Sequence, residues 1–290
     1  MPAWLFDFPD ALYLNIKTPI DSAIKYMLVN WNSFFDGLSR GLGGFLNGVA
    51  AAVNLIPWWL LLAGVFIVSL RTTKKLGRAL LYTALLAFVG VIGLWALMYQ
   101  TLAIVITSVL ISLLLGLPIG VLISSGDKAN TIIRPILDTM QTMPSFVYLI
   151  PAAMLLGLGN VPAVIATTIY AVPPVIRLTS LGIRQVDTEV VEAAKAFGAT
   201  RAQALFKVQI PQAMPTIMTG INQTIMMAIS MVVTCSMIGA TGLGAEVITG
   251  INRLESGRGF AAGISIVIVA IIMDRLTQGM FRKERDTRDE

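Results

Sequence analysis

The chain has 290 residues, of which 56% are hydrophobic and only 13% are charged, and its mean hydropathy is +0.79. These values exclude an ordinary soluble domain and predict an all-α, polytopic integral membrane protein. The net charge of +5 is expected to reflect basic residues gathered on one side of a bilayer, so nucleic acid is not an expected partner. The chain has no histidine and one cysteine, Cys235, which predicts neither a disulfide nor a metal site.

The first expected element is an amphipathic helix over residues 20–49. Its apolar residues recur at close to a 3.6-residue period, while polar residues such as Asp21, Lys25 and Arg40 occupy much of the other face. Such a helix lies along a membrane surface more naturally than across it. The alternative is an amphipathic helix packed on another part of the protein. We assign residues 1–56 to an extracytoplasmic amphipathic segment.

Seven apolar stretches follow as candidate membrane spans. Most of them approach the roughly 20 apolar residues that are needed to cross a bilayer. The first stretch is short, so a span there would have to include residues that precede residue 57. The seven stretches are residues 57–70, 79–98, 101–123, 135–158, 161–183, about 216–238, and 260–280.

Lysine and arginine residues are divided unequally between alternate loops. Sixteen of the 21 fall on the side that carries residues 187–211 and the C-terminus, and five fall on the side of the N-terminal helix. Because loops rich in basic residues stay in the cytoplasm, we expect the C-terminus inside and the N-terminus outside. An odd number of spans requires the same arrangement.

The expected spans contain long stretches without charge. No Asp, Glu, Lys or Arg occurs in residues 79–126, 139–176 or 208–245. A charge at mid-membrane costs about 2.5–3.5 kcal/mol and is usually kept for a proton relay or an ion pathway. A proton-driven transporter is therefore not expected, although a sodium site made of backbone carbonyls would leave no such mark.

Prolines interrupt several spans, most densely in the segment MQTMPSFVYLIP at residues 140–151. Each proline frees backbone groups that neighbouring helices or a watery cavity must satisfy. One interpretation is a set of kinked helices that line a translocation pathway, and the alternative is structural bends in a bundle. The pathway candidates in this segment are Met143, Pro144, Phe146 and Tyr148.

A polar segment between two spans begins at Asp187 and ends at Pro211, and it is expected to form two short helices joined by a bend. Asp187 can cap the first helix, and Gly198 is the permissive residue that ends it. Thr200 and Gln203 have the spacing of a capping box, and Pro211 is expected to stop the second helix. An apolar stripe for docking is expected at Val190, Val191, Ala194 and Phe197.

This polar elbow resembles the EAA motif of binding-protein-dependent ABC importer permeases. The motif is EAA, three residues, Gly, nine residues and I-x-L-P. Here Glu192-Ala193-Ala194 is followed by Gly198 and by VQIP, which ends at Pro211. Val and Ile replace the Ile and Leu of the motif conservatively. The stretches LDTMQTMPSFVYLIPA, PPVIRLTSLGIRQV and GINQTIMMAISMVV resemble the glycine betaine/proline betaine permease branch.

The resemblance implies a permease subunit of an ATP-driven importer for a compatible solute such as glycine betaine or proline betaine, in a bacterial cytoplasmic (inner) membrane. It implies a type I core of five helices over residues 99–281, with the cytoplasmic coupling loop at 187–211. Residues 57–98 would form two accessory transmembrane helices, and residues 282–290 a cytoplasmic charged tail.

The resemblance also implies partners: an ABC ATPase subunit, an extracytoplasmic substrate-binding protein, a second permease copy in a homodimer, and membrane lipid. The chain has no Gly-Lys pair and so no Walker site, which places ATP and Mg on the partner ATPase and leaves this chain without cofactor or catalytic residues. By matching positions, the residues expected to couple to the ATPase are Glu192, Ala193, Ala194, Gly198, Ala199, Arg201 and Pro211.

Other functions make different predictions. A related importer for choline, carnitine, histidine or another small zwitterion would share the same motif. An ion-coupled secondary transporter predicts inverted repeats and buried ionisable residues, which are not evident in the sequence. An intramembrane enzyme predicts a histidine or a pair of acids within the spans.

Overall fold

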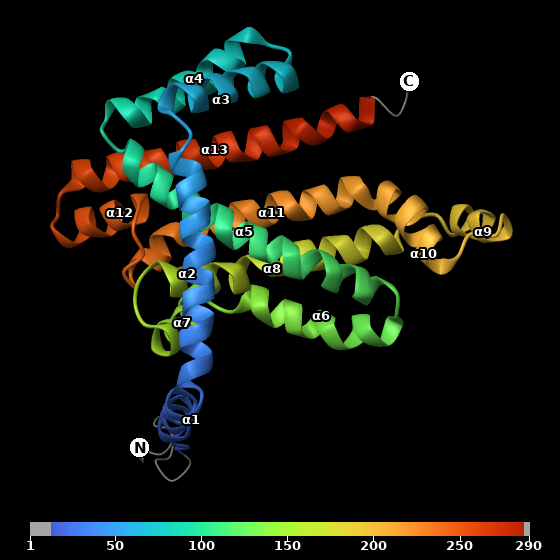
Figure 1. The fold of residues 1–290 in the computed structure, drawn as a ribbon, viewed down its shortest axis with the longest axis horizontal. Coiled ribbons are helices and arrows are strands. Elements are labelled where there is room, and N and C mark those ends of the chain that lie inside the picture. The colour runs from blue at the N-terminus through green and yellow to red at the C-terminus, as the bar shows by residue number, and fades with distance from the viewer. Residues whose placement is uncertain (1–12, 287–290) are drawn as a thin grey trace, which may run out of the picture.

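The computed structural model describes the backbone of residues 13–286 and the side chains of residues 13–279. Every regular element in this range is a helix, which confirms the predicted all-α class (Figure 1). In chain order the elements are α1 (Lys17–Asn30), α2 (Asn32–Asn54), α3 (Trp58–Thr73), α4 (Leu76–Val91), α5 (Trp95–Ser124), α6 (Asp127–Thr142), α7 (Ser145–Leu156), α8 (Asn160–Arg184), α9 (Thr188–Ala196), α10 (Arg201–Ala204), the π-helix η3 (Leu205–Gln209), α11 (Ile210–Ser236), α12 (Leu243–Asn252) and α13 (Ser256–Asp286).

Four long helical segments form the centre of the molecule. Helix α8 packs on both α5 and α11, and α13 packs on α11 (Figure 1). The elbow formed by α9 and α10 lies at one end of this bundle, and α12 lies at the opposite end. We call these the elbow end and the α12 end.

Length and composition allow four straight helical segments to cross a membrane: Trp95–Ser124, Asn160–Arg184, Arg201–Ser236 and Ser256–Gly279. Two further candidates are bent pairs, α2 with α3 at 83° and α6 with α7 at 93°. Helix α4 is apolar but has only 16 residues. The total of seven spans stays a prediction, because several of the predicted stretches are not single straight helices.

The boundary between the second and third predicted spans was placed wrongly. Helix α4 ends at Val91, and α5 already begins at Trp95, so residues 95–98 belong to α5. The chain reverses through Gly93, whose φ of +78° is accessible to glycine at little cost. The residues on both sides of this turn are apolar, so hydropathy does not show where α4 ends and α5 begins.

The predicted span 135–158 is also not one straight helix. Met143 leaves the helical region with ψ of 133°, and Pro144 begins the next segment with ψ of 137°. The ring of a proline disfavours the helical conformation of the residue before it, which explains why α6 stops here. Helix α7 then starts in a new direction.

The expected amphipathic helix over 20–49 is present as two helices, α1 and α2, which separate at Trp31. Helix α2 packs on α5, α7 and α8 and crosses the long helices in Figure 1. Its buried residues are Phe35, Leu46 and Val53. The structure therefore supports the alternative interpretation, in which this amphipathic helix packs on another part of the protein. Residues 1–12 of the proposed segment lie outside the described range.

Glycines allow α5 and α8 to approach closely. A Cβ atom at Gly116 would lie 2.3 Å from a methyl carbon of Val175, and one at Gly120 would lie 2.8 Å from the carbonyl oxygen of Ile176. Small residues at such crossings let helix backbones come together, which increases van der Waals contact inside a membrane. The α5–α8 pair is thus a tight central unit of the bundle.

Candidate functional site

The first half of the elbow is organised by a side-chain cap. The Asp187 carboxylate accepts a hydrogen bond from the backbone N–H of Glu189 at 2.9 Å, which confirms the predicted cap of α9. An acceptor at this position satisfies one of the N–H groups that a helix leaves free at its start. The start of helix α9 is therefore fixed by a residue adjacent to it in the sequence.

The bend of the elbow is a Schellman motif. The backbone N–H of Gly198 donates to the carbonyl of Lys195 at 2.9 Å, and that of Ala199 donates to the carbonyl of Ala194 at 3.0 Å. Gly198 has φ of +85°, as this motif requires of its left-handed residue. A Cβ atom at Gly198 would have no neighbour within 4 Å. Within this chain, glycine is thus required for backbone conformation and not for space.

The second half of the elbow begins with the predicted capping box. The hydroxyl of Thr200 accepts from the backbone N–H of Gln203 at 3.3 Å, and the side-chain oxygen of Gln203 accepts from the backbone N–H of Thr200 at 2.8 Å. The two bonds satisfy two backbone donors reciprocally. They fix the direction in which α10 leaves the bend.

The prediction that Pro211 ends this helix was wrong. The helix runs on from Arg201 to Ser236, and Pro211 lies in the first turn of α11. A proline inside a helix lacks an N–H donor and crowds the carbonyl four residues before it. Here the preceding turn is the π-helix Leu205–Gln209, whose wider hydrogen-bond spacing accommodates that disturbance. The elbow is therefore continuous with α11.

The surface of the elbow is largely open. No residue of α9 is buried: Glu192 and Ala193 are exposed, and Ala194 is half-buried. The Phe197 side chain is 95% exposed, although phenylalanine buries well when it has a surface to pack on. The Phe197 ring is therefore accessible for contact with another molecule.

The remaining predicted coupling residues follow the bend. Ala199 is half-buried, Arg201 is exposed in the first turn of α10, and Pro211 is half-buried. The structure brings residues 192–201 together at the bend, whereas Pro211 lies further along the helix. Phe206, which was not among the predicted coupling residues, also exposes most of its ring in this region.

Comparison with known proteins decides what kind of protein has this elbow. The model of the family described as binding-protein-dependent transport system inner membrane component matches residues 112–286. The chain belongs to this family.

Several relatives of this permease match it over most of their length. The glycine betaine transport system permease protein OpuAB of Bacillus subtilis is 46% identical over 266 residues, which cover 92% of this chain and 94% of the relative. The glycine betaine/carnitine transport permease protein GbuB of Listeria monocytogenes is 47% identical, with 93% and 99% covered. The glycine betaine/proline betaine permease protein ProW of Escherichia coli is 44% identical, with 92% and 76% covered.

Solved structures share the fold. Inward-facing conformations of the MetNI methionine ABC transporter match with a TM-score of 0.57 at 23% identity, covering 67% of this permease and 94% of the solved chain. An amino acid ABC transporter matches with a TM-score of 0.52 at 24% identity, covering 65% and 91%. These matches confirm the predicted ABC importer permease fold.

Two ion pairs connect α6 to α8 near the elbow of this permease. Arg177 pairs with Asp138, and Arg184, in the last turn of α8, pairs with Asp127. All four side chains are at least one third exposed, so each pair adds little to stability. The pairs mark where the charged faces of α6 and α8 meet.

The four pathway candidates do not converge on one site. Tyr148 is buried, its hydroxyl donates to the carbonyl of Met140 at 2.5 Å, and Met143 packs against the same buried cluster. Phe146 is 51% exposed, and Pro144 is exposed at the start of α7. A pathway role for all four stays a prediction.

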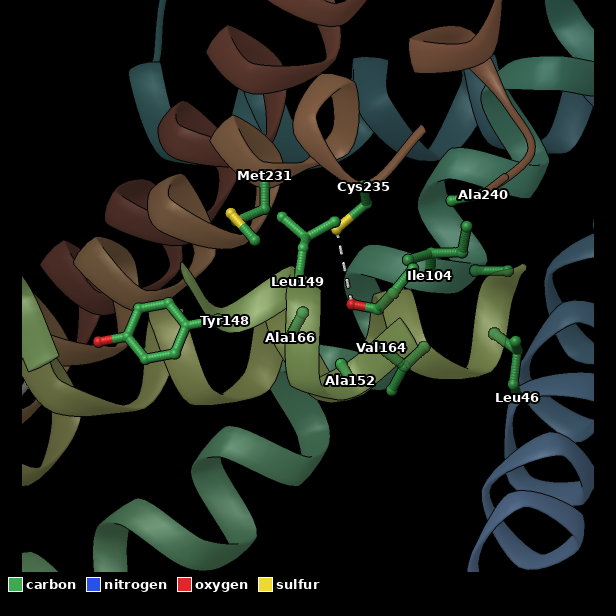
Figure 2. Close-up of a cluster of buried hydrophobic side chains, with 12 residues drawn as sticks. Leu46, Ile104, Tyr148, Leu149, Ala152, Val164, Ala166, Met231, Cys235 and Ala240 are labelled. Atoms are coloured by element: carbon green, nitrogen blue, oxygen red, sulfur yellow. Dashed lines mark hydrogen bonds between the residues drawn. The ribbon is translucent and has the colours of Figure 1, made fainter. Parts of the chain in front are cut away.

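The buried cluster around Tyr148 joins five helices of the permease, α2, α5, α7, α8 and α11 (Figure 2). Residues of α7 pack there against α8 and α11, and Leu46 reaches it from α2. The Cys235 thiol donates to the carbonyl of Ala163 at 3.6 Å, the contact drawn as a dashed line. Cys235 is buried, as expected of a small apolar residue.

Asp274, an acid within the predicted span 260–280, was not among the predicted site residues. Its carboxylate accepts hydrogen bonds from the side-chain amides of Asn222 at 2.8 Å and Gln278 at 2.6 Å. The Asp274 side chain is only 18% exposed. A lone acid in an apolar stretch was the signal that could have identified it, because intramembrane ionisable residues are usually paired.

At the α12 end, polar interactions connect α12 to α13 and to α5. Glu246 in α12 pairs with Arg258 at the start of α13, where a second guanidinium nitrogen donates to the carboxylate at 3.0 Å. This hydrogen bond, more than the nearby charges of Arg258 and Arg253, lowers the pKa of Glu246. The hydroxyl of Thr101 also accepts from the backbone N–H of Leu243 at 2.8 Å. Helix α12 is thereby held on α13 and α5.

Proposed function

We propose that this chain is the membrane-spanning permease subunit of an ATP-driven importer for glycine betaine or proline betaine. The observation that carries the proposal is the open EAA elbow at one end of the helix bundle, continuous with the long α11. Relatives that are 44–47% identical are named for glycine betaine transport. The chain supplies the translocation pathway, and ATP with Mg²⁺ binds to a separate ABC ATPase subunit.

We infer that the elbow seats on that ATPase. Small alanines at 193 and 194 permit close approach, and Gly198 provides the bend. Phe197 is an exposed apolar anchor of the kind that dominates binding energy at interfaces. The proposed coupling surface comprises Glu192, Ala193, Ala194, Gly198, Ala199 and Arg201. Pro211 acts differently from the sequence-based expectation, since it lies where the elbow passes into α11.

The proposed arrangement in the membrane follows from the distribution of basic residues. The elbow end and the C-terminus face the cytoplasm, and the N-terminus faces outside. A second copy of the chain completes the pathway as a homodimer, and an extracytoplasmic binding protein delivers solute at the α12 end. Because residues 95–98 belong to α5, the proposed core is residues 95–281 and the proposed accessory pair is residues 57–94, with residues 282–290 as the cytoplasmic tail.

Reconstituted transport tests the proposed function. Proteoliposomes containing the permease, its candidate ATPase and its candidate binding protein should accumulate labelled glycine betaine only when ATP is supplied. Choline, carnitine and histidine serve as competing solutes. Accumulation without ATP or without the ATPase contradicts an ABC importer. ATP-dependent uptake of choline or carnitine in place of a betaine contradicts only the proposed substrate.

The proposed binding of the elbow to the ATPase can be tested separately by truncating the Phe197 side chain. Phe197→Ala should weaken the affinity for the ATPase about 30-fold or more and so reduce its copurification, because loss of an aromatic interface anchor costs at least about 2 kcal/mol. The matched control is Phe260→Ala, since Phe260 is 73% exposed but lies at the α12 end. Equal copurification of the ATPase with both variants would contradict the assigned coupling surface.

A further inference from the structure

A polar cavity of about 870 Å³ lies between the accessory hairpin α3–α4 and the core helices α11 and α13. Its lining includes Thr72 at the end of α3, Arg78 in α4, Thr219 in α11, and Arg275 in α13. The size falls within the range of about 300–1,000 Å³ that is usual for ligand pockets. The cavity is separate from the elbow surface and from the buried cluster around Tyr148.

Two guanidinium groups give the cavity its charge. Among the described residues, Arg78 has no hydrogen-bond or ion-pair partner, and Arg275 approaches only Asp274, at 3.8 Å. Asp274 already accepts hydrogen bonds from Asn222 and Gln278. An arginine carries five N–H donors and does not lose its charge in proteins. Most of these donors are therefore available to a bound anion.

The start of α4 adds to the positive potential. Lys75 is its N-cap but makes no side-chain cap, and the first turn of α4 contains Arg78 and no acid. The free N–H groups of a helix start carry partial positive charge and favour anions. The same turn between α3 and α4 also contains Lys74. Basic side chains and a helix N-terminus thus surround one side of the cavity.

The threonine hydroxyl groups that line the cavity are not free donors. Thr72 and Thr73 donate to the carbonyl of Ser69, at 3.2 and 2.8 Å, and Thr219 donates to the carbonyl of Pro215 at 3.0 Å. Recognition of an anion consequently falls mainly to the two arginines, with the Tyr82 hydroxyl as a further donor in the lining. Arginine suits phosphate particularly well, because its planar fork can form two parallel hydrogen bonds with two phosphate oxygens.

We propose that this cavity binds a phosphate group, held between Arg78 of the accessory hairpin and Arg275 of the core. The phosphate can belong to a lipid headgroup or to a free phosphate compound. The outer face of α4 beside Arg78 is apolar, with exposed Leu80 and Leu81, as an acyl chain would require. Because the two arginines lie on different helices, the bound phosphate bridges the hairpin to the core.

Lipid binding to the full chain tests the site. The permease, purified in detergent and supplied with phosphatidylglycerol, should retain this lipid in native mass spectrometry. Arg78→Gln and Arg275→Gln should each lower the retained fraction about tenfold, as expected for the loss of a charge-assisted hydrogen bond. Arg71→Gln is the matched control, because Arg71 is in the last turn of α3 and does not line the cavity. Diacylglycerol, which has no phosphate, should not be retained.

A second arm identifies the source of the phosphate. Inorganic phosphate is added to the same protein in detergent without phospholipid, and thermal protection is measured. Protection that is lost in Arg78→Gln supports a free phosphate ligand, whereas protection by phosphatidylglycerol alone supports a lipid headgroup. Arg78→Lys keeps the charge and should retain partial binding, which checks the site if the glutamine variant does not fold. Binding by neither probe, or equal loss in Arg71→Gln, overturns the proposal.

Discussion

The carboxylate of Asp274 in α13 accepts a 2.8 Å hydrogen bond from the side-chain amide of Asn222 in α11. This bond joins two of the long helices inside the part of α13 that is apolar enough to cross a membrane. A charge in such a position is tolerated only when neighbouring groups satisfy it. The pair is therefore a structural connection on which the packing of α13 depends.

Removal of the amide should destabilise the permease. In Asn222→Ala the Asp274 carboxylate loses a donor, which is expected to cost about 1–3 kcal/mol of unfolding free energy. Denaturant titration in detergent measures the change. Asp274→Ala should cost less when Asn222 is already replaced, because the two residues act as one unit. Strict additivity of the two substitutions would contradict this connection.

The close crossing of α5 and α8 predicts a steep penalty at Gly120. In Gly120→Ala the new methyl group meets the carbonyl oxygen of Ile176, and backbone cannot move aside as a flexible side chain can. We expect a loss of about 1–3 kcal/mol in unfolding free energy, as for other overpacked sites. The matched control is Gly77→Ala in α4, where a Cβ atom meets nothing within 4 Å. Equal stability of the two variants would show that the helices are further apart.

Two substitutions at Gly198 can distinguish a requirement for positive φ from a requirement for a small side chain. Asparagine adopts positive φ more readily than alanine but is larger. If the φ of +85° is the main requirement, Gly198→Asn should couple ATP hydrolysis to transport better than Gly198→Ala. If close contact with the ATPase dominates, the order reverses. Equal, normal coupling in both variants, measured as solute transported per ATP, would remove Gly198 from the coupling surface.

The Glu246–Arg258 pair predicts a pH dependence at the α12 end. Arg258 lowers the pKa of Glu246 in the folded protein, so the pair stabilises the fold above the unfolded pKa of about 4.3. This stabilisation is lost as pH falls through the lower folded value. Glu246→Gln should thus unfold at a lower temperature than the original protein at neutral pH, and the difference should narrow in acid. A constant difference across this range would contradict the assignment.

Local chemistry made much of the elbow predictable from sequence. The cap at Asp187, the capping box of Thr200 and Gln203, and the left-handed Gly198 all depend on residues within a few positions of one another. Such interactions follow from residue type and spacing alone. The structure therefore agrees with the sequence at each of these positions.

The wrong predictions concern positions where packing with other elements decides the backbone conformation. Pro211 was expected to end a helix, but the preceding π-turn lets the helix continue. The reversal at Gly93 and the bend at Met143 lie within apolar stretches, so hydropathy gives no signal for them. The hydrogen bond of Asp274 was not predicted because its partner Asn222 is 52 residues away in the sequence. Long-range pairs of this kind require the folded arrangement.

The helix from Arg201 to Ser236 is continuous, so it connects the elbow to the far end of α11. Its 36 residues span about 54 Å at the usual rise of 1.5 Å per residue. A tilt of about 5° at the elbow end would displace the far end by about 5 Å. A helix that stopped at Pro211 would absorb such a tilt in a hinge. If the elbow couples to an ATPase as proposed, a tilt of the elbow would therefore move the far end of α11, because the helix continues through the π-turn.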